Sequence, residues 1–115
     1  MTEFYTPDSL IAGDHPIVTQ SVTVATGQNL KRGTLLGKVS ASGKVVLSEA
    51  AANDGSQTPY AVLSEDTDAT DGDKTTIAYL SGEFDEDSIT FGIGHTADSA
   101  RDALRAINIY LKTLV

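Results

Sequence analysis

Four acidic side chains gather within the stretch YLSGEFDEDS, residues 79–88. If this stretch is a regular strand, Glu83, Asp85 and Asp87 share one face, with neighbouring Cα atoms about 7 Å apart. Glycosidases separate their paired carboxylates by similar distances. A catalytic pair needs one carboxyl group in a dry pocket that raises its pKa, and four acids this close together, with Glu86, are hard to desolvate. We therefore expect a solvated strand end; a small acidic hydrolase using Glu83 and Asp85 is the enzymatic alternative.

A second acidic stretch, DTDATDGDK at residues 66–74, superficially resembles a calcium-binding loop. The ligand pattern fails, because the glycine position holds Asp71 and the twelfth position holds Ile77 instead of glutamate. We expect a polar turn at Asp71-Gly72, and weak ion binding by residues 66–73 stays open.

Other residues that could take part in catalysis or ligand binding form no recognisable motif. The two histidines, His15 and His95, do not have metal-ligand spacing. Residues 92–94 (GIG) supply only part of a phosphate-binding turn. Ser81 and Ser99 have no base within a known motif. We expect no enzyme, no metal and no cofactor.

The composition narrows the class of protein further. The 115 residues suffice for one domain with a single core. The absence of cysteine excludes disulfides and thiolate metal sites. A formal net charge of −8 opposes binding to nucleic acid phosphates. The polar, acidic start lacks the features of a secretory signal, and no apolar run approaches the length of a membrane span. We expect a soluble, non-exported protein that binds neither nucleic acid nor membrane.

Residues 1–15 are predicted to form a flexible N-terminal arm, because proline and glycine interrupt any apolar periodicity. Residues 16–115 are expected to form a single β-rich domain. Exposed apolar side chains on the arm would suit a segment that orders on a partner, and a plain disordered tail is the alternative. The apolar residues of the arm are Phe4, Tyr5, Leu10 and Ile11.

The rest of the chain alternates between short strand signals and one helix signal. Apolar and β-branched runs predict strands over residues 17–25, 34–39, 44–47, 60–64 and 74–80. The second and third of these flank residues 40–43 (SASG), which predicts a β-hairpin.

The last third of the chain predicts one amphipathic helix. Thr96 can cap it, and small or apolar residues follow at three- and four-residue spacing. We expect the helix to end near Asn108, although residues 108–113 also alternate in part like a strand.

The order of several segments resembles the head decoration proteins of tailed bacteriophages, the lambda head protein D family. The resemblance covers about residues 30–113 and rests on LKRGTLLGKV, SGKVVLS, YAVLSED, DATDGDK, YLSGEF and GIGHTADSARDALRA. Its most specific element is YLSGEF, with Tyr79, Ser81, Gly82 and Phe84. In this element Gly82 can permit a bend or a close backbone approach, and Phe84 is expected to anchor the chain to the core.

The resemblance implies both a fold and a function. The fold would be mixed and mainly β, a small β-barrel or β-tulip-like α+β domain with one C-terminal amphipathic helix and an extended arm. The function would be that of a capsid cement protein. Homotrimers would sit at threefold axes of the expanded head, on the outer capsid surface, and hold the major capsid protein against the pressure of packaged DNA. Assembly would take place in the host bacterial cytoplasm.

In this family the arm is expected to order on the capsid and add a strand to a capsid-protein element. We therefore expect capsid contacts from Phe4, Tyr5, Leu10 and Ile11, with Ile17 and Val18 at the transition to the core. Another minor virion structural protein, such as a head-completion protein, is the alternative within the same class.

Overall fold

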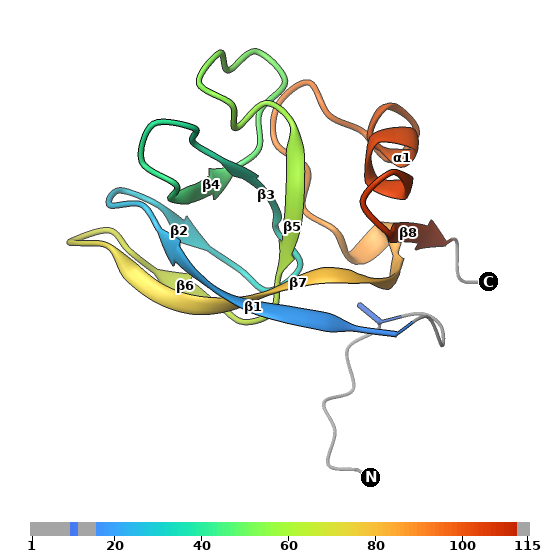
Figure 1. The fold of residues 1–115 in the computed structure, drawn as a ribbon, viewed down its shortest axis with the longest axis horizontal. Coiled ribbons are helices and arrows are strands. Elements are labelled where there is room, and N and C mark those ends of the chain that lie inside the picture. The colour runs from blue at the N-terminus through green and yellow to red at the C-terminus, as the bar shows by residue number, and fades with distance from the viewer. Residues whose placement is uncertain (1–9, 12–15, 113–115) are drawn as a thin grey trace, which may run out of the picture.

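The computed structural model describes residues 10–11 and 16–112, and its central feature is a five-stranded β-barrel (Figure 1). Its strands are β1 (Val18–Val24), β3 (Leu35–Lys38), β4 (Val45–Leu47), β5 (Pro59–Leu63) and β7 (Lys74–Asp85). They follow the order β1-β4-β3-β5-β7, and pairing of β1 with β7 closes the ring. The prediction of a mainly β, barrel-like domain is confirmed.

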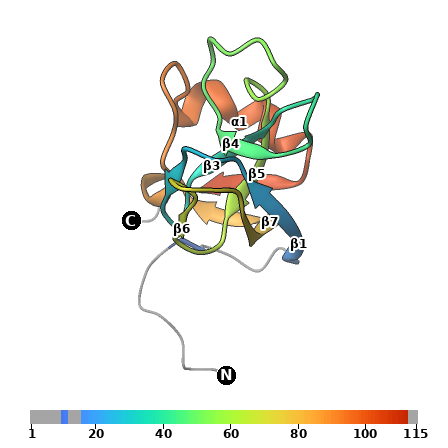
Figure 2. The ribbon, with the colours of Figure 1, turned by 90° about the vertical axis from the view of Figure 1, so that its left-hand side faces the viewer.

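Five further elements surround the barrel. β2 (Asn29–Leu30) and β6 (Thr67–Asp68) form a small ribbon, and β8 (Ile109–Lys112) pairs in parallel with the end of β7. A 3₁₀ turn, η1 (Glu86–Ser88), and the helix α1 (Ala97–Arg105) complete the list. Figure 2 views the molecule from the side opposite α1. No helix among the described residues has the length and apolarity that a membrane crossing requires.

The predicted hairpin is β3–β4, in which Leu36 pairs with Leu47 and Lys38 with Val45. Gly43 in its loop has φ +75°, a conformation that glycine adopts without steric cost. The other predicted strands also form, and the last of them continues well past residue 80 as β7.

β7 changes its pairing partner at Gly82. Up to Ser81 it pairs with β1, and from Gly82 onward it pairs with β8. Gly82 has φ +147°, and a Cβ atom there would lie 3.0 Å from Cζ of Phe84. A glycine is therefore required for both the conformation and the space, as the sequence led us to expect.

The buried apolar side chains form two clusters on opposite sides of the barrel wall. The barrel core consists of Val22, Val24, Leu30, Leu36, Val45, Ala61, Leu63, Ala69 and Ala78. The outer core consists of Leu10, Leu35, Val62, Phe84, Ile89, Ala100, Leu104, Ile109 and Leu111. Because side chains alternate along a strand, the neighbours Leu35 and Leu36 belong to different cores.

The helix α1 covers the outer core with Ala100 and Leu104. It begins at the predicted cap, where Thr96 and Ser99 satisfy each other's main-chain N–H groups. It ends at Arg105, earlier than expected, and Asn108 with φ +69° turns the chain into β8. β8 then pairs with β7 over residues 109–112, within the stretch whose partial alternation resembled a strand.

Candidate partner-binding surface

The residues predicted to contact a partner divide into three groups. Phe4 and Tyr5 lie outside the described residues. Leu10 is buried, with 1% of its surface exposed. The others are partly exposed on the surface: Ile11 at 38%, Ile17 at 41% and Val18 at 52%.

Leu10 differs from the expectation of an exposed arm residue. Its side chain is part of the outer core, and its carbonyl oxygen accepts a hydrogen bond of 2.7 Å from the N–H of Asp85. The next residue, Ile11, forms a β-bridge with Phe84. Burial of a leucine side chain stabilises a protein by about 1.5–3 kcal/mol, which explains why this position joins the core. Leu10 therefore fixes the N-terminal segment to the domain.

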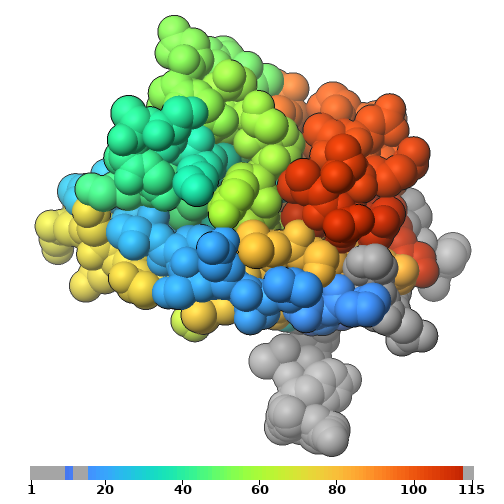
Figure 3. All heavy atoms as spheres, viewed as in Figure 1, coloured from blue at the N-terminus to red at the C-terminus, as the bar shows by residue number. Residues whose placement is uncertain are grey.

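We use the name arm base for the described residues Leu10, Ile11, Pro16, Ile17 and Val18. Figure 3 shows the start of β1, in blue, on the surface of the molecule. Two further exposed isoleucines, Ile77 at 39% and Ile93 at 80%, lie in the middle of β7 and in the loop before α1.

The residues of the YLSGEF element hold the arm base in place. The Ser81 hydroxyl donates to the carbonyl of Pro16 (2.9 Å) and accepts from the N–H of Val18 (3.1 Å). Gly82 lies next to Ile17: a Cβ atom at Gly82 would be 3.4 Å from Cγ1 of Ile17, an ordinary van der Waals distance. This element thus fixes the place where the N-terminal segment joins the barrel.

The aromatic residues of the same element connect the arm base to the outer core. Phe84 is fully buried, as expected, and its ring centroid lies 5.4 Å from that of Tyr79. The Tyr79 hydroxyl accepts a hydrogen bond of 2.9 Å from the Arg32 guanidinium, whose Cζ lies 5.7 Å from the ring centroid. Phe84, through its β-bridge with Ile11, joins the arm base to this group.

The acidic side chains between positions 83 and 87 make separate structural contacts. Glu83 forms an ion pair with Lys112 (3.3 Å). Asp85 caps η1, because its carboxylate accepts hydrogen bonds from the N–H of Asp87 (3.1 Å) and the hydroxyl of Ser88 (3.2 Å). Glu83 and Asp85 therefore do not share one site, and the contacts favour a structural role over the hydrolase alternative.

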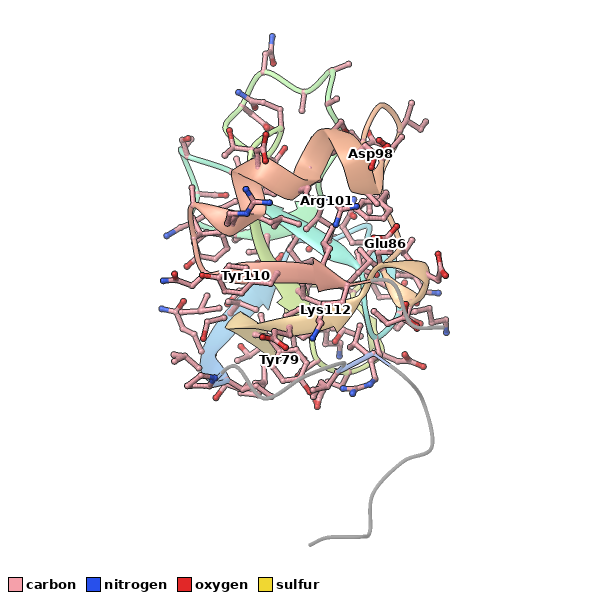
Figure 4. All side chains as sticks on the ribbon, turned by 90° about the vertical axis from the view of Figure 1, so that its right-hand side faces the viewer. Tyr79, Glu86, Asp98, Arg101, Tyr110 and Lys112 are labelled. Atoms are coloured by element: carbon pink, nitrogen blue, oxygen red, sulfur yellow. The ribbon has the colours of Figure 1, made fainter. Side chains whose placement is uncertain are left out.

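Glu86 belongs to a third set of contacts, which joins η1, α1 and β8. Figure 4 shows Arg101 between Asp98 and Glu86. Its guanidinium lies 3.0 Å from the Glu86 carboxylate and donates to the carbonyl of Leu111 (3.1 Å). The hydrogen bond with Glu86 raises the pKa of Arg101 above its ordinary value. Arg101 therefore links the helix to the outer strand.

The acids of residues 66–73 also make structural contacts. Asp66 accepts from the N–H of Arg32 (2.8 Å), and hydrogen bonds from Thr70 lower the pKa of Asp68. Asp73 lies 2.7 Å from the Lys44 ammonium; hydrogen bonds from Lys44 and Thr26 lower its pKa from the ordinary value of 3.8 to about 2. Within the described residues, no group of three or more acidic or histidine side chains is placed to hold a metal ion.

One polar contact, which involves His95, was not predicted from the sequence. His95 Nε2 lies 3.1 Å from both the Ser48 hydroxyl and the Gln57 carbonyl, and the Ser48 hydroxyl donates to the carbonyl of Ser56 (2.7 Å). A serine beside a histidine can be a nucleophile, but Ser48 is fully buried and its proton is already donated. The contact joins two loops 47 positions apart in the sequence, a separation that no local pattern reveals.

The described part of the chain is thus a small β-barrel in which Glu83, Asp85 and Glu86 make structural contacts and the arm base carries exposed apolar side chains. The family model of bacteriophage lambda head decoration protein D matches residues 2–109. The chain therefore belongs to this family of phage head decoration proteins, which places it in the capsid of the virion. The match begins at residue 2 and so extends beyond the resemblance noted from about residue 30. No curated protein matches the chain.

Proposed function

We propose that this protein is a capsid cement protein that binds as homotrimers at the threefold axes of the expanded phage head. Its partner is the major capsid protein, and its role is to stabilise the shell against the pressure of packaged DNA. The observation that supports this most strongly is the family match over residues 2–109. The structural roles of Glu83, Asp85 and Glu86 support a protein without catalytic activity. The protein would be made and assembled in the bacterial cytoplasm.

The stabilising mechanism follows from linked equilibria. A ligand that binds the expanded shell and not the unexpanded one shifts the equilibrium toward the expanded state by its difference in affinity. A trimer that touches several capsid subunits at once combines several weak contacts into strong attachment. No single contact site on the protein has to be strong.

The arm base supplies the capsid contacts in this proposal, together with Phe4 and Tyr5. Ile11, Ile17 and Val18 are exposed and lie where the N-terminal segment joins the barrel. Leu10 acts differently, because it is buried and holds the segment to the outer core.

The direct test adds purified protein to expanded heads that carry no decoration and images the particles. We expect density over the threefold positions in many copies per particle, and none on unexpanded heads. A protein bound in one or a few copies would instead be a minor component such as a head-completion protein. Absence of density on expanded heads would overturn the proposal.

A deletion tests the role of the N-terminal segment. Removal of residues 1–9 leaves Leu10 in the outer core, so we expect the urea unfolding midpoint to stay the same while head binding is lost. Unchanged head binding by this variant would show that the capsid contacts lie elsewhere. The variant Leu10→Ala serves as comparison, because it should lower stability.

A further inference from the structure

Strand β1 is hydrogen-bonded along one edge only. It pairs with β7 from Val18 to Val24, whereas its pairing with β4 on the other edge is limited to Val24 and Val45. The barrel is therefore closed by a full ladder on one side of β1 and by a single contact on the other.

The hydrogen bonds of β7 show which main-chain groups of β1 point outward. The carbonyl of Ile77 accepts from the N–H of Ser64 (3.1 Å), so the main chain of Ile77 faces β5. Because successive residues of a strand point their N–H and C=O groups to opposite sides, the main chain of Ala78 faces β1. Its partner Gln20 is therefore in a hydrogen-bonded position.

By the same alternation, the main-chain groups of Thr19 and Ser21 point away from β7. Ala25, which belongs to the same alternating set, donates its N–H to the carbonyl of Val45 on the opposite side (3.0 Å). Within the part of the chain that the structure describes, the main-chain groups of Thr19 and Ser21 have no partner on this outer edge. The edge thus offers two N–H groups and two carbonyl oxygens.

This edge lacks the features that normally prevent strand addition. Residues 18–23 (VTQSVT) contain no charged residue and no proline, and residues 18–21 are exposed. Natural proteins usually protect exposed edges with lysine, proline or a bulge, because an open edge binds further strands. The only irregularity in this ladder lies between Val18 and Thr19, before the open positions. Figure 3 shows β1, in blue, uncovered on this face of the molecule.

A groove of about 200 Å³ runs beside the open edge and carries a positive charge. It is lined by residues 20–23 of β1, by Val45, and by Lys38 and Tyr60. The Lys38 ammonium lies 5.3 Å from the centre of the Tyr60 ring, and the Tyr60 hydroxyl donates to Gln20 (2.9 Å). In the described part of the chain, no carboxylate forms an ion pair with Lys38. Although the net charge of the protein is −8, this cation gives the groove a local charge that complements a carboxylate.

We propose that the outer edge of β1 at Thr19 and Ser21 binds an extended segment of the capsid protein, which adds a strand to the barrel and places a carboxylate opposite Lys38. This inference rests on the proposed function, because it names the partner from it. It concerns a different contact from that of the arm: here the barrel is the template and the capsid protein supplies the strand.

The test compares two substitutions at one position. Ser21→Pro removes the outward N–H, and Ser21→Ala removes only the side-chain hydroxyl. We expect Ser21→Pro to bind expanded heads about tenfold more weakly or worse, and Ser21→Ala to bind like the unmodified protein. Urea unfolding of both variants checks the fold, since proline is tolerated at outward-facing edge positions.

A charge reversal gives a second test that does not depend on proline. Lys38→Glu should weaken head binding about tenfold, with a larger effect at low salt, while the unmodified protein binds normally. If the unmodified protein binds heads and neither Ser21→Pro nor Lys38→Glu weakens that binding, the inference fails and the proposed function stands. If the unmodified protein does not bind, the proposed function itself fails. Loss of self-association by Ser21→Pro without loss of head binding would assign the edge to a second copy and overturn the capsid assignment.

Discussion

The two cores of this protein are assembled from different parts of the chain. The barrel core draws its residues from one stretch, from Val22 to Ala78. The outer core combines the N-terminal Leu10, strand residues from the barrel wall and the C-terminal third from Phe84 to Leu111. The barrel core therefore depends on neighbouring strands, whereas the outer core depends on contacts between the two ends of the chain.

This difference separates a core that includes an arm-base residue from one that does not. The barrel core can form without the N-terminal segment, because none of its members comes from that segment. The outer core contains Leu10 and so transmits any change in its packing to the arm base. We expect substitutions in the two cores to destabilise the protein similarly but to affect the arm base differently.

The largest loss of stability should come from substitution of either of two neighbouring leucines on β3. Leu35→Ala opens the outer core and Leu36→Ala the barrel core, and each should lower the free energy of unfolding by about 2–5 kcal/mol. Only Leu35→Ala should speed hydrogen exchange of the Asp85 amide, which is bonded to the Leu10 carbonyl. Urea unfolding and native-state exchange measure the two effects. Equal exchange in both variants would mean that the cores are not separate.

A smaller loss of stability is expected from substitution of Gly82, where β7 passes from one core to the other. Gly82→Ala places a side chain at φ +147° and against the Phe84 ring, which should cost roughly 1–3 kcal/mol. Gly72→Ala is the matched control, because nothing lies within 4 Å of the added methyl group. Thermal unfolding of both variants decides the matter, and equal melting temperatures would contradict the role given to Gly82.

The helix cap affects only the outer core and should matter less. Thr96→Ala removes the side chain that accepts from the Ser99 N–H, and should lower stability by about 1 kcal/mol. Thr96→Ser keeps the accepting oxygen and should restore most of that loss in chemical denaturation. If Thr96→Ser were as unstable as Thr96→Ala, the cap would not be the cause.

The smallest effect on stability should come from Asp73, which precedes the barrel strand β7, and it should appear only at acidic pH. Because the folded-state pKa of Asp73 is lowered to about 2, its contribution to stability is present above its ordinary value of 3.8 and is lost as the pH falls from about 4 to about 2. Asp73→Asn should flatten the pH dependence of stability in this range. Asp71→Asn serves as the control, since the Asp71 side chain forms no hydrogen bond or ion pair with another residue that the structure describes. A profile unchanged by Asp73→Asn would rule out this source of acid sensitivity.

Local sequence patterns predicted the strands and the helix better than the way in which they pack together. The β3–β4 hairpin followed from alternation around Gly43, and the start of α1 followed from Thr96. Closure of the barrel by β1 and β7 joins residues from 50 positions apart (Val24 and Lys74) to 63 positions apart (Val18 and Ser81), and no pattern within either strand specifies that pairing. The end of α1 was expected near Asn108 and lies at Arg105, because residues 106–108 form a turn in which Asn108 adopts φ +69° and leads into β8.

The candidate site shows the same limit. Gly82 and Phe84 could be assigned correctly because a glycine within a strand and an aromatic residue beside acids each have a local physical meaning. Leu10 was expected to be exposed, since nothing near it in the sequence shows that the outer core has room for its side chain. The open edge of β1 was missed as well, because it depends on which neighbours a strand lacks.

The position of Leu10 shortens the tether that carries Phe4 and Tyr5. If the segment were free up to Ile17, Phe4 could lie as far as about 45 Å from its point of attachment. With Leu10 held in the outer core, Phe4 is six residues from a fixed point and can lie at most about 20 Å from it. In the proposed function, a capsid contact made by Phe4 would therefore lie within about 20 Å of Leu10.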